Sequence, residues 1–227
     1  MKLVITIDGP AGSGKSTISR QLAKKLNLLY LDTGAMYRAV ALQAHRQGLG
    51  MDQGQLLRKM CQDLDLNFDR TFDPVRIRIS DEDVSAAIRT PEMDMLSSKI
   101  SMVKEVRAEM TALQQKMGQN GGLIAEGRDM GTVVFPQADF KFFLTASLEV
   151  RVDRRYRERG DRGENISRDI ICSELKKRDE QDTNRSLAPL KPAEDAAIID
   201  TTALNIDQVV DFIIKSIEKR EVTRNND

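Results

Sequence analysis

The sequence has few or none of several residue types on which common classes of protein depend. It contains no tryptophan, one histidine and two cysteines, and aromatic residues make up 4% of it. With His45 alone, we expect neither a Ser-His-Asp triad nor a multi-histidine metal site. Cys61 and Cys172 lie far apart and form no metal or redox spacing, so we expect reduced thiols. The scarcity of aromatic side chains also argues against stacking of single-stranded nucleic acid.

The sequence also has a formal net charge of zero and no long apolar run at its start. Lys and Arg together number 35, as do Asp and Glu, so no excess of charge favours nucleic acid or a membrane surface. The apolar start ends at Asp8, which makes it too short for a signal peptide or a membrane span. We therefore expect a cytoplasmic protein that binds neither nucleic acid nor membrane. Its 227 residues suffice for one sizeable domain with insertions.

What the sequence does contain is a phosphate-binding loop near its start. Residues 9–16 read GPAGSGKS and match the pattern G-x-x-x-x-G-K-S/T at every fixed position. Glycines allow a tight turn in which successive amide N–H groups point into one concavity, and the following helix adds its dipole. Lys15 is expected to reach the β- and γ-phosphates, and the Ser16 hydroxyl to hold Mg²⁺. The expected ATP-binding residues are Gly9, Pro10, Ala11, Gly12, Ser13, Gly14, Lys15, Ser16 and Thr17.

Short apolar segments alternate with amphipathic ones along most of the chain. This alternation predicts an α/β fold with a parallel sheet of about five strands and right-handed crossovers. Residues 66–86 differ, because 75–79 alternates apolar and charged residues and predicts a small separate antiparallel sheet. Thr90 and Pro91 are typical of a helix start, and that helix is expected to break near Ser101. The predicted core strands are 3–7, 28–31, 123–126, 140–144 and 196–200, and the other predicted helices are 17–26, 35–47, 52–65 and 206–220.

Arginines are placed where a second phosphate could bind. Arg38 and Arg128 each follow a predicted strand or its turn, and ligands of parallel sheets bind at the carboxyl ends of strands. Guanidinium groups match phosphate bidentately, so several of them on a closing lid suit phosphoryl transfer. Arg151 and Arg155 are four residues apart and share a helix face. Charge runs usually face solvent, which we expect of Arg154, Arg157, Arg159 and Arg162.

Four segments carry a resemblance to a known family. Residues 7–16, 31–38 (LDTGAMYR), 127–136 (GRDMGTVVFP) and 177–185 (KRDEQDTNR) closely resemble the bacterial cytidylate kinases, and the likeness continues in order along the chain. It implies a P-loop NTPase fold with an inserted nucleoside monophosphate-binding subdomain and a helical lid. The implied parts are a core of 1–31, 119–148 and 191–227, an insertion of 32–118, and an Arg-rich lid of 149–190. A monomer is also implied.

The resemblance further implies transfer of the γ-phosphoryl group of ATP to CMP or dCMP with Mg²⁺, a step of pyrimidine nucleotide metabolism. Family members often have Asp where this chain has Glu126, so the role of Glu126 stays open. The residues implied for the acceptor phosphate are Thr33, Arg38, Arg128 and Arg185. Those implied for the cytosine are Ser98, Arg107 and Asp129, with Asp182 at the sugar hydroxyls. Those implied for the transferred group are Lys15, Arg128, Arg151, Arg155 and Arg178.

Two other functions stay open on the residues alone. One is a P-loop kinase for a different small acceptor, either another nucleoside monophosphate or a shikimate-like compound. The other is a nucleotide-binding regulator without turnover. A GTPase switch would need an Asn/Thr-Lys-x-Asp segment to read its base, and the sequence contains none.

Overall fold

The computed structural model describes residues 3–69, 72 and 75–224, and side chains up to residue 219. The chain divides into two compact units. The first consists of Met1–Leu31 with Asn120–Asp227, and the second is Asp32–Gln119. The first unit is therefore built from two stretches of sequence separated by the whole of the second.

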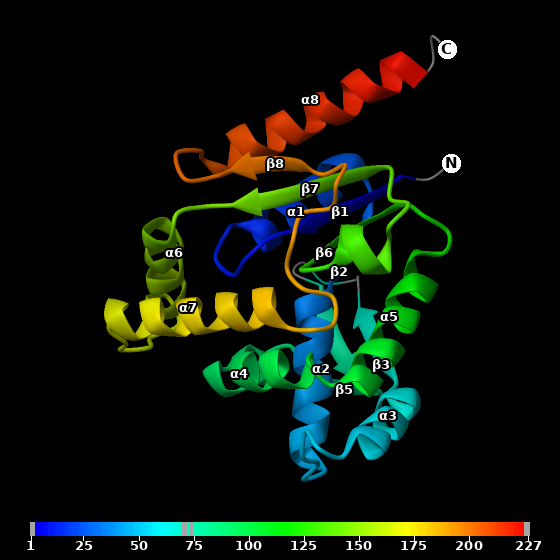
Figure 1. Cartoon of the computed structure of the whole chain (residues 1–227), viewed down its shortest axis with the longest axis vertical. Coiled ribbons are helices and arrows are strands. Elements are labelled where there is room, and N and C mark those ends of the chain that lie inside the picture. The colour runs from blue at the N-terminus through cyan, green and yellow to red at the C-terminus, as the bar shows by residue number, and fades with distance from the viewer. Residues whose placement is uncertain (1–2, 70–71, 73–74, 225–227) are drawn as a thin grey trace. The chain divides into compact units, whose positions relative to one another are not determined.

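The first unit contains a five-stranded sheet in the order β2-β6-β1-β7-β8 (Figure 1). Strand β1 lies in the middle and pairs in parallel with β6 and β7, so that Ile7 faces Glu126 on one side and Phe142 on the other. Strand β8 pairs in parallel with β7. The predicted parallel five-stranded sheet is thus confirmed. The strands are β1 Val4–Asp8, β2 Leu29–Asp32, β6 Leu123–Gly127, β7 Phe140–Thr145 and β8 Ala197–Asp200.

Helices bury the apolar strands of this sheet. Ile18 and Leu22 of α1 (Lys15–Leu26) and Ile213 of α8 (Ile206–Arg224) join the core around Ile5 and Ile7. Continuous apolar strands are typical of parallel sheets that are covered by helices. Helix α8 packs against α1. Helices α6 (Leu148–Gly160) and α7 (Arg168–Asn184) pack on each other through a smaller cluster of Val152, Ile171 and Leu175.

The second unit combines helices with a three-stranded antiparallel sheet in the order β3-β4-β5. The small sheet predicted within residues 66–86 is confirmed. The predicted helix start is also confirmed, because the Thr90 hydroxyl accepts a hydrogen bond from Met93 N and Pro91 is the first helical residue. The helix ends at Ile100, where a break near Ser101 was predicted. The elements are α2 Thr33–Arg46, α3 Gly54–Asp63, β3 Leu66–Asp69, β4 Arg76–Ile79, β5 Glu82–Asp83, α4 Pro91–Ile100 and α5 Lys104–Gly118.

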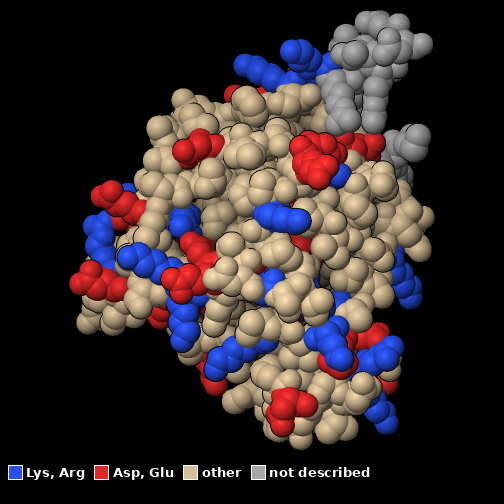
Figure 2. Space-filling model, in the orientation of Figure 1, with Lys and Arg blue, Asp and Glu red and all other residues tan. Residues whose placement is uncertain are grey.

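Charged side chains of both signs share the surface. On the face shown in Figure 2, Lys and Arg side chains are mixed with Asp and Glu rather than gathered in one patch. Within the described part of the chain, no helix combines the length and apolar character needed to cross a membrane.

Candidate active site

The loop after β1 has the backbone that phosphate binding requires. Gly9 has a φ of 146°, and a Cβ at this position would come 2.0 Å from the Leu144 carbonyl oxygen, so only glycine fits. Helix α1 begins at Lys15, and its N-cap Gly14 provides no side-chain hydrogen bond. The first turn of α1 carries no acidic residue. Its N–H groups and its positive dipole end are therefore available to an anion.

Lys15 is folded back into this loop. Its Nζ donates a hydrogen bond to the Pro10 carbonyl oxygen at 2.7 Å, and the side chain is buried. Burial, followed by the nearby positive charge of Arg128, lowers the pKa of Lys15 to about 7, against a weaker opposing effect of Glu126. Without a bound anion, the neutral amine of Lys15 is therefore much easier to reach than that of an exposed lysine.

This lowered pKa predicts that nucleotide binding takes up protons. Phosphate groups next to Lys15 favour its ammonium form, so ADP binding at pH 8 without metal should draw up to about one proton per site from the buffer. Calorimetric titration in two buffers of different ionisation enthalpy measures the uptake. In a Lys15→Arg variant the guanidinium is always charged, and the uptake should vanish. A binding heat that does not depend on the buffer in the unaltered protein would contradict the prediction.

Glu126 lies at the end of β6 and accepts two hydrogen bonds. The Ser16 hydroxyl donates to Oε1 at 2.6 Å, and the Tyr30 hydroxyl donates to Oε2 at 2.8 Å. Hydroxyl and carboxylate oxygens are the hard ligands that Mg²⁺ prefers, and Mg²⁺ is commonly held by one or two protein oxygens together with substrate phosphates. The donor set of Ser16 and Glu126 therefore fits this ion. No group of three or more His, Cys, Asp or Glu side chains that could hold a metal occurs in the described residues.

Two arginines and two aspartates of the predicted site meet in the first unit. Arg128 Nε donates to Asp182 Oδ2 at 2.7 Å, and Arg128 Nη1 donates to the Gly127 carbonyl oxygen. Arg185 lies 3.5 Å from Asp129 and 4.0 Å from Asp182. The structure thus brings together four of the residues predicted for the acceptor, Arg128, Asp129, Asp182 and Arg185.

The charges of this cluster keep Asp182 ionised. Burial alone would raise the pKa of Asp182, but the charges of Arg128 and Arg178 and the hydrogen bond from Arg128 outweigh it and lower the pKa. The carboxylate is therefore ionised at neutral pH and can balance the neighbouring arginines when no phosphate is present.

Arg151 joins α6, α7 and the phosphate-binding loop. Its Nη1 lies 2.7 Å from Asp179 Oδ2 on α7 and donates to the Ala11 carbonyl oxygen at 3.2 Å, while Nε donates to the Ala146 carbonyl oxygen. The side chain is buried. The guanidinium that was predicted to act on the transferred group is therefore held next to the loop that would bind ATP.

The other two predicted lid arginines differ from Arg151 in their surroundings. Arg155 forms an ion pair with Glu158 at 2.8 Å within α6. The charge of Arg178 lowers the pKa of both Lys15 and Asp182, which places its guanidinium near both side chains. Arg178 therefore belongs to the same charged neighbourhood as the loop lysine.

The expectation of a solvent-facing arginine run is wrong at Arg159 and incomplete at Arg154. Arg159 is buried and pairs with Glu164 at 2.6 Å and Glu174 at 2.7 Å, so it joins α6 to α7. Arg154 donates to the hydroxyl and carbonyl oxygens of Thr201, after β8. Arg157, by contrast, is exposed. Partners distant in sequence decide between these outcomes, and a local charge pattern does not reveal them.

Arg38 in the second unit lies between two carboxylates. It is 3.7 Å from Asp32 and 3.7 Å from Asp94, and its Nε donor has no hydrogen-bond partner among the described residues. Its side chain is 15% exposed, so this donor is largely shielded from water. Thr33 is buried at the first position of α2. A largely buried guanidinium with an unused donor suits an anionic ligand.

Two of the three residues predicted to read the base, Ser98 and Arg107, also lie in this unit, whereas Asp129 lies in the first. Arg107 on α5 is buried, donates to the Ser101 carbonyl oxygen at 3.2 Å, and lies 5.8 Å from the ring centre of Tyr37. The Ser101 hydroxyl in turn donates to the Ser98 carbonyl oxygen. The link through Ser101 connects Ser98 on α4 with Arg107 on α5.

Sequence reasoning missed the roles of Asp8, Tyr30 and Asp179. The two Asp8 carboxylate oxygens accept hydrogen bonds from the amides of Met130 and Gly131, and burial raises the pKa of Asp8 to about 6. Asp8 thereby fixes the segment that follows Arg128 and Asp129. Its position directly before the glycine loop was a usable signal, whereas Tyr30 and Asp179 carry no local pattern.

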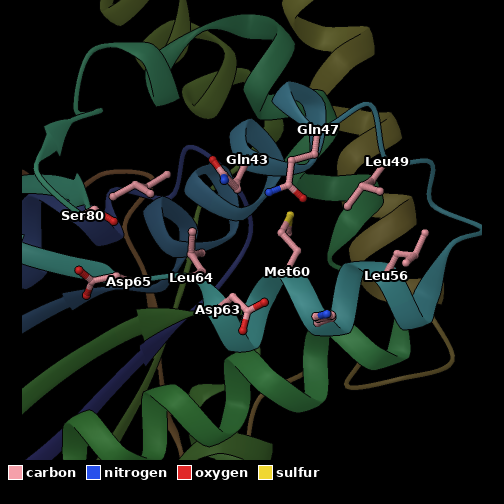
Figure 3. Close-up of a pocket in the computed structure, with 11 residues that line it drawn as sticks. Gln43, Gln47, Leu49, Leu56, Met60, Asp63, Leu64, Asp65 and Ser80 are labelled. Atoms are coloured by element: carbon pink, nitrogen blue, oxygen red, sulfur yellow. The ribbon is translucent and has the colours of Figure 1, made fainter.

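A cavity of about 300 Å³ lies within the second unit (Figure 3). Its lining includes Gln43 and Gln47 of α2 and Met60 and Asp63 of α3. It shares no residue with the predicted site.

Comparisons with known proteins agree with this geometry. The family model described as "Cytidylate kinase" matches residues 5–219. A cytidylate kinase of Syntrophotalea carbinolica is 48% identical over 220 residues, 97% of this chain and 94% of that protein. One from Geobacter sulfurreducens is 47% identical over 219 residues, 96% of this chain and 94% of that protein.

Among solved structures, an uncharacterized protein from Eubacterium ventriosum matches with a TM-score of 0.54 at 11% identity, covering 96% of this chain and 99% of that one. This likeness concerns the fold alone. The family match and the relatives, which cover nearly the whole chain, show that the chain belongs to the cytidylate kinase family.

Proposed function

We propose that the chain transfers the γ-phosphoryl group of ATP to CMP or dCMP, forming ADP and CDP or dCDP. The observation that carries the proposal is the likeness to cytidylate kinases over almost the entire chain. The chemistry of the site agrees. The glycine loop leads into a helix whose first turn has no side-chain cap, which suits the phosphates of ATP. Arginines paired with carboxylates in the same molecule suit a second phosphate.

The donor end is formed by residues 9–17. Loop amides and the start of α1 would bind the ATP phosphates, and Lys15 would leave the Pro10 carbonyl oxygen to reach the β- and γ-phosphates. Ser16 and Glu126 would hold Mg²⁺. When bound, this ion bridges phosphate oxygens and neutralises their charge.

The proposed acceptor end takes residues from Asp32–Gln119 and from Asn120–Asp227. We assign Thr33, Arg38, Arg128 and Arg185 to the acceptor phosphate. Cytosine offers an amino donor and two acceptors, which suit a carboxylate or hydroxyl and an arginine. We assign Ser98, Arg107 and Asp129 to this base, and Asp182 to the sugar hydroxyls.

The transfer needs positioning and charge neutralisation more than covalent chemistry. The acceptor is already a phosphate anion, so no strong general base is required. Arg151, Arg155 and Arg178 would stabilise charge on the equatorial oxygens of the transferred group, and the proposed lid of 149–190 would exclude water. We also propose a cytoplasmic monomer, and sedimentation velocity would test its oligomeric state.

A panel of acceptors tests the function directly. With ATP and Mg²⁺, ADP release should be faster with CMP and dCMP than with UMP, AMP, GMP, dTMP or shikimate by at least about tenfold. Even uracil, the most similar base, presents an acceptor at position 4 and a donor at N3 where cytosine presents the reverse. Preference for another acceptor would assign a different kinase activity. ADP release that no acceptor stimulates would favour a nucleotide-binding regulator.

A further inference from the structure

Three elements of the first unit meet at the Glu126 carboxylate. Ser16 comes from the first turn of α1, Tyr30 from β2, and Glu126 from β6. The two hydroxyl groups bind different oxygens of the carboxylate, at 2.6 Å and 2.8 Å. Glu126 itself is 6% exposed, so these contacts are made largely away from water. Both oxygens of the carboxylate therefore have a donor that fixes their direction.

A glutamate needs such a second donor more than an aspartate would. It has one more rotatable bond, and its terminal torsion is broadly distributed. A tyrosine side chain is rigid apart from two torsions and carries its hydroxyl at a fixed distance from the ring. A hydrogen bond from Tyr30 to Oε2 therefore restricts the rotation that would turn Oε1 away from Ser16.

The strands do not need this hydroxyl to stay together. β2 and β6 are neighbours in the sheet, and the backbone already joins the two segments through a hydrogen bond from Leu29 N to the Gly122 carbonyl oxygen at 2.8 Å. The Tyr30 hydroxyl instead reaches the one carboxylate that also contacts the Ser16 side chain. The Tyr30 hydroxyl therefore affects how the Glu126 carboxylate and the Ser16 hydroxyl are oriented toward each other.

We propose that Tyr30 is a positioning residue of the Mg²⁺ site, which acts by holding Glu126 so that Ser16 keeps its proton directed at Oε1 and its lone pairs available to the cation. This rests on the proposed function, since the cation would arrive with ATP. Groups that orient metal ligands typically change metal affinity 10- to 100-fold when removed.

The test measures metal binding without turnover. Mn²⁺ serves as a spin probe for Mg²⁺, titrated by electron paramagnetic resonance in the presence of a non-hydrolysable ATP analogue. Tyr30→Phe removes one oxygen and should weaken Mn²⁺ binding about tenfold. Binding of the same analogue in EDTA, and binding of CMP, should be unchanged. The matched control is Tyr156→Phe, which removes a hydroxyl from an exposed tyrosine on α6 and should leave all three affinities unaltered.

Repeating Tyr30→Phe in a Glu126→Ala variant tests whether Tyr30 acts through Glu126. In Glu126→Ala the carboxylate is gone, so adding Tyr30→Phe should weaken Mn²⁺ binding no further. An equal loss in both backgrounds, or an unchanged Mn²⁺ affinity with lowered thermal stability, would overturn the proposal. If Tyr30→Phe does not fold, Mn²⁺ binding to Glu126→Ala decides instead, because an unchanged affinity there removes the basis of the proposal. The unaltered enzyme is assayed with CMP in parallel. Absence of CMP phosphorylation there would contradict the proposed function, whereas the Mn²⁺ affinities test the role of Tyr30.

Discussion

Replacing Lys15 with alanine is expected to lower the turnover number by on the order of a thousandfold. The ammonium group is the one cation that the loop itself places within reach of the phosphates, and alanine cannot neutralise the charge that develops during transfer. The substitution removes the hydrogen bond from Lys15 to the Pro10 carbonyl oxygen. The fold should persist nevertheless, because alanine is a strong helix former at the start of α1. ADP release with saturating CMP measures turnover, and a circular dichroism melt checks the fold.

Lys24→Ala is the matched control for this variant. Lys24 lies on the same helix but in its last turn and is exposed, so its removal should leave turnover unchanged. Near-normal activity of Lys15→Ala would remove the basis for placing ATP in this loop. A loss of folded protein in Lys15→Ala alone would show that the lysine has a structural role instead.

Replacing Arg128 with alanine is expected to lower kcat/KM for CMP by about 100- to 1000-fold and to leave ATP binding nearly unchanged. Arg128 donates a hydrogen bond to Asp182 through Nε and to the Gly127 carbonyl oxygen through Nη1. A phosphate can therefore accept from the remaining N–H groups of the guanidinium while Asp182 holds Nε.

The melting temperature of Arg128→Ala must be measured together with its activity. Asp182 is buried and would lose its nearest cation, although Arg185 remains 4.0 Å away. Assays should therefore be run well below the melting temperature of the variant. Arg157→Ala, which removes an exposed arginine from α6, should behave as the unaltered enzyme. A fall in ATP affinity rather than CMP affinity would show that the donor and acceptor ends are assigned the wrong way round.

Local sequence patterns were sufficient to predict the sheet and the loop. An apolar β-branched strand, a glycine pattern and an amphipathic helix follow one another within residues 3–26, and each depends only on near neighbours. The Thr90 cap and the end of α4 near Ser101 were predictable for the same reason. The order of the strands was not, because pairing joins segments far apart in the chain.

Side-chain partners were the least predictable part of the site. Arg159 was expected at the surface from its charged neighbours, yet it pairs with Glu174 on the next helix. The bond from Arg128 to Asp182 and the contacts of Glu126 likewise depend on tertiary packing. Only the resemblance to a family indicated that Arg128, Asp129, Asp182 and Arg185 belong to one site, and their contacts in the first unit agree with it.

The central place of β1 has a consequence for synthesis of the chain. β1 is made before the other described strands, and its partners β6 and β7 are made about 120 and 135 residues later. At ordinary rates of translation the strand waits on the order of ten seconds for its first neighbour. The intervening Asp32–Gln119 is compact by itself. The nucleotide loop is thus made well before the two strands that flank β1, and we expect a nascent chain to bind ATP only after β6 and β7 have been made.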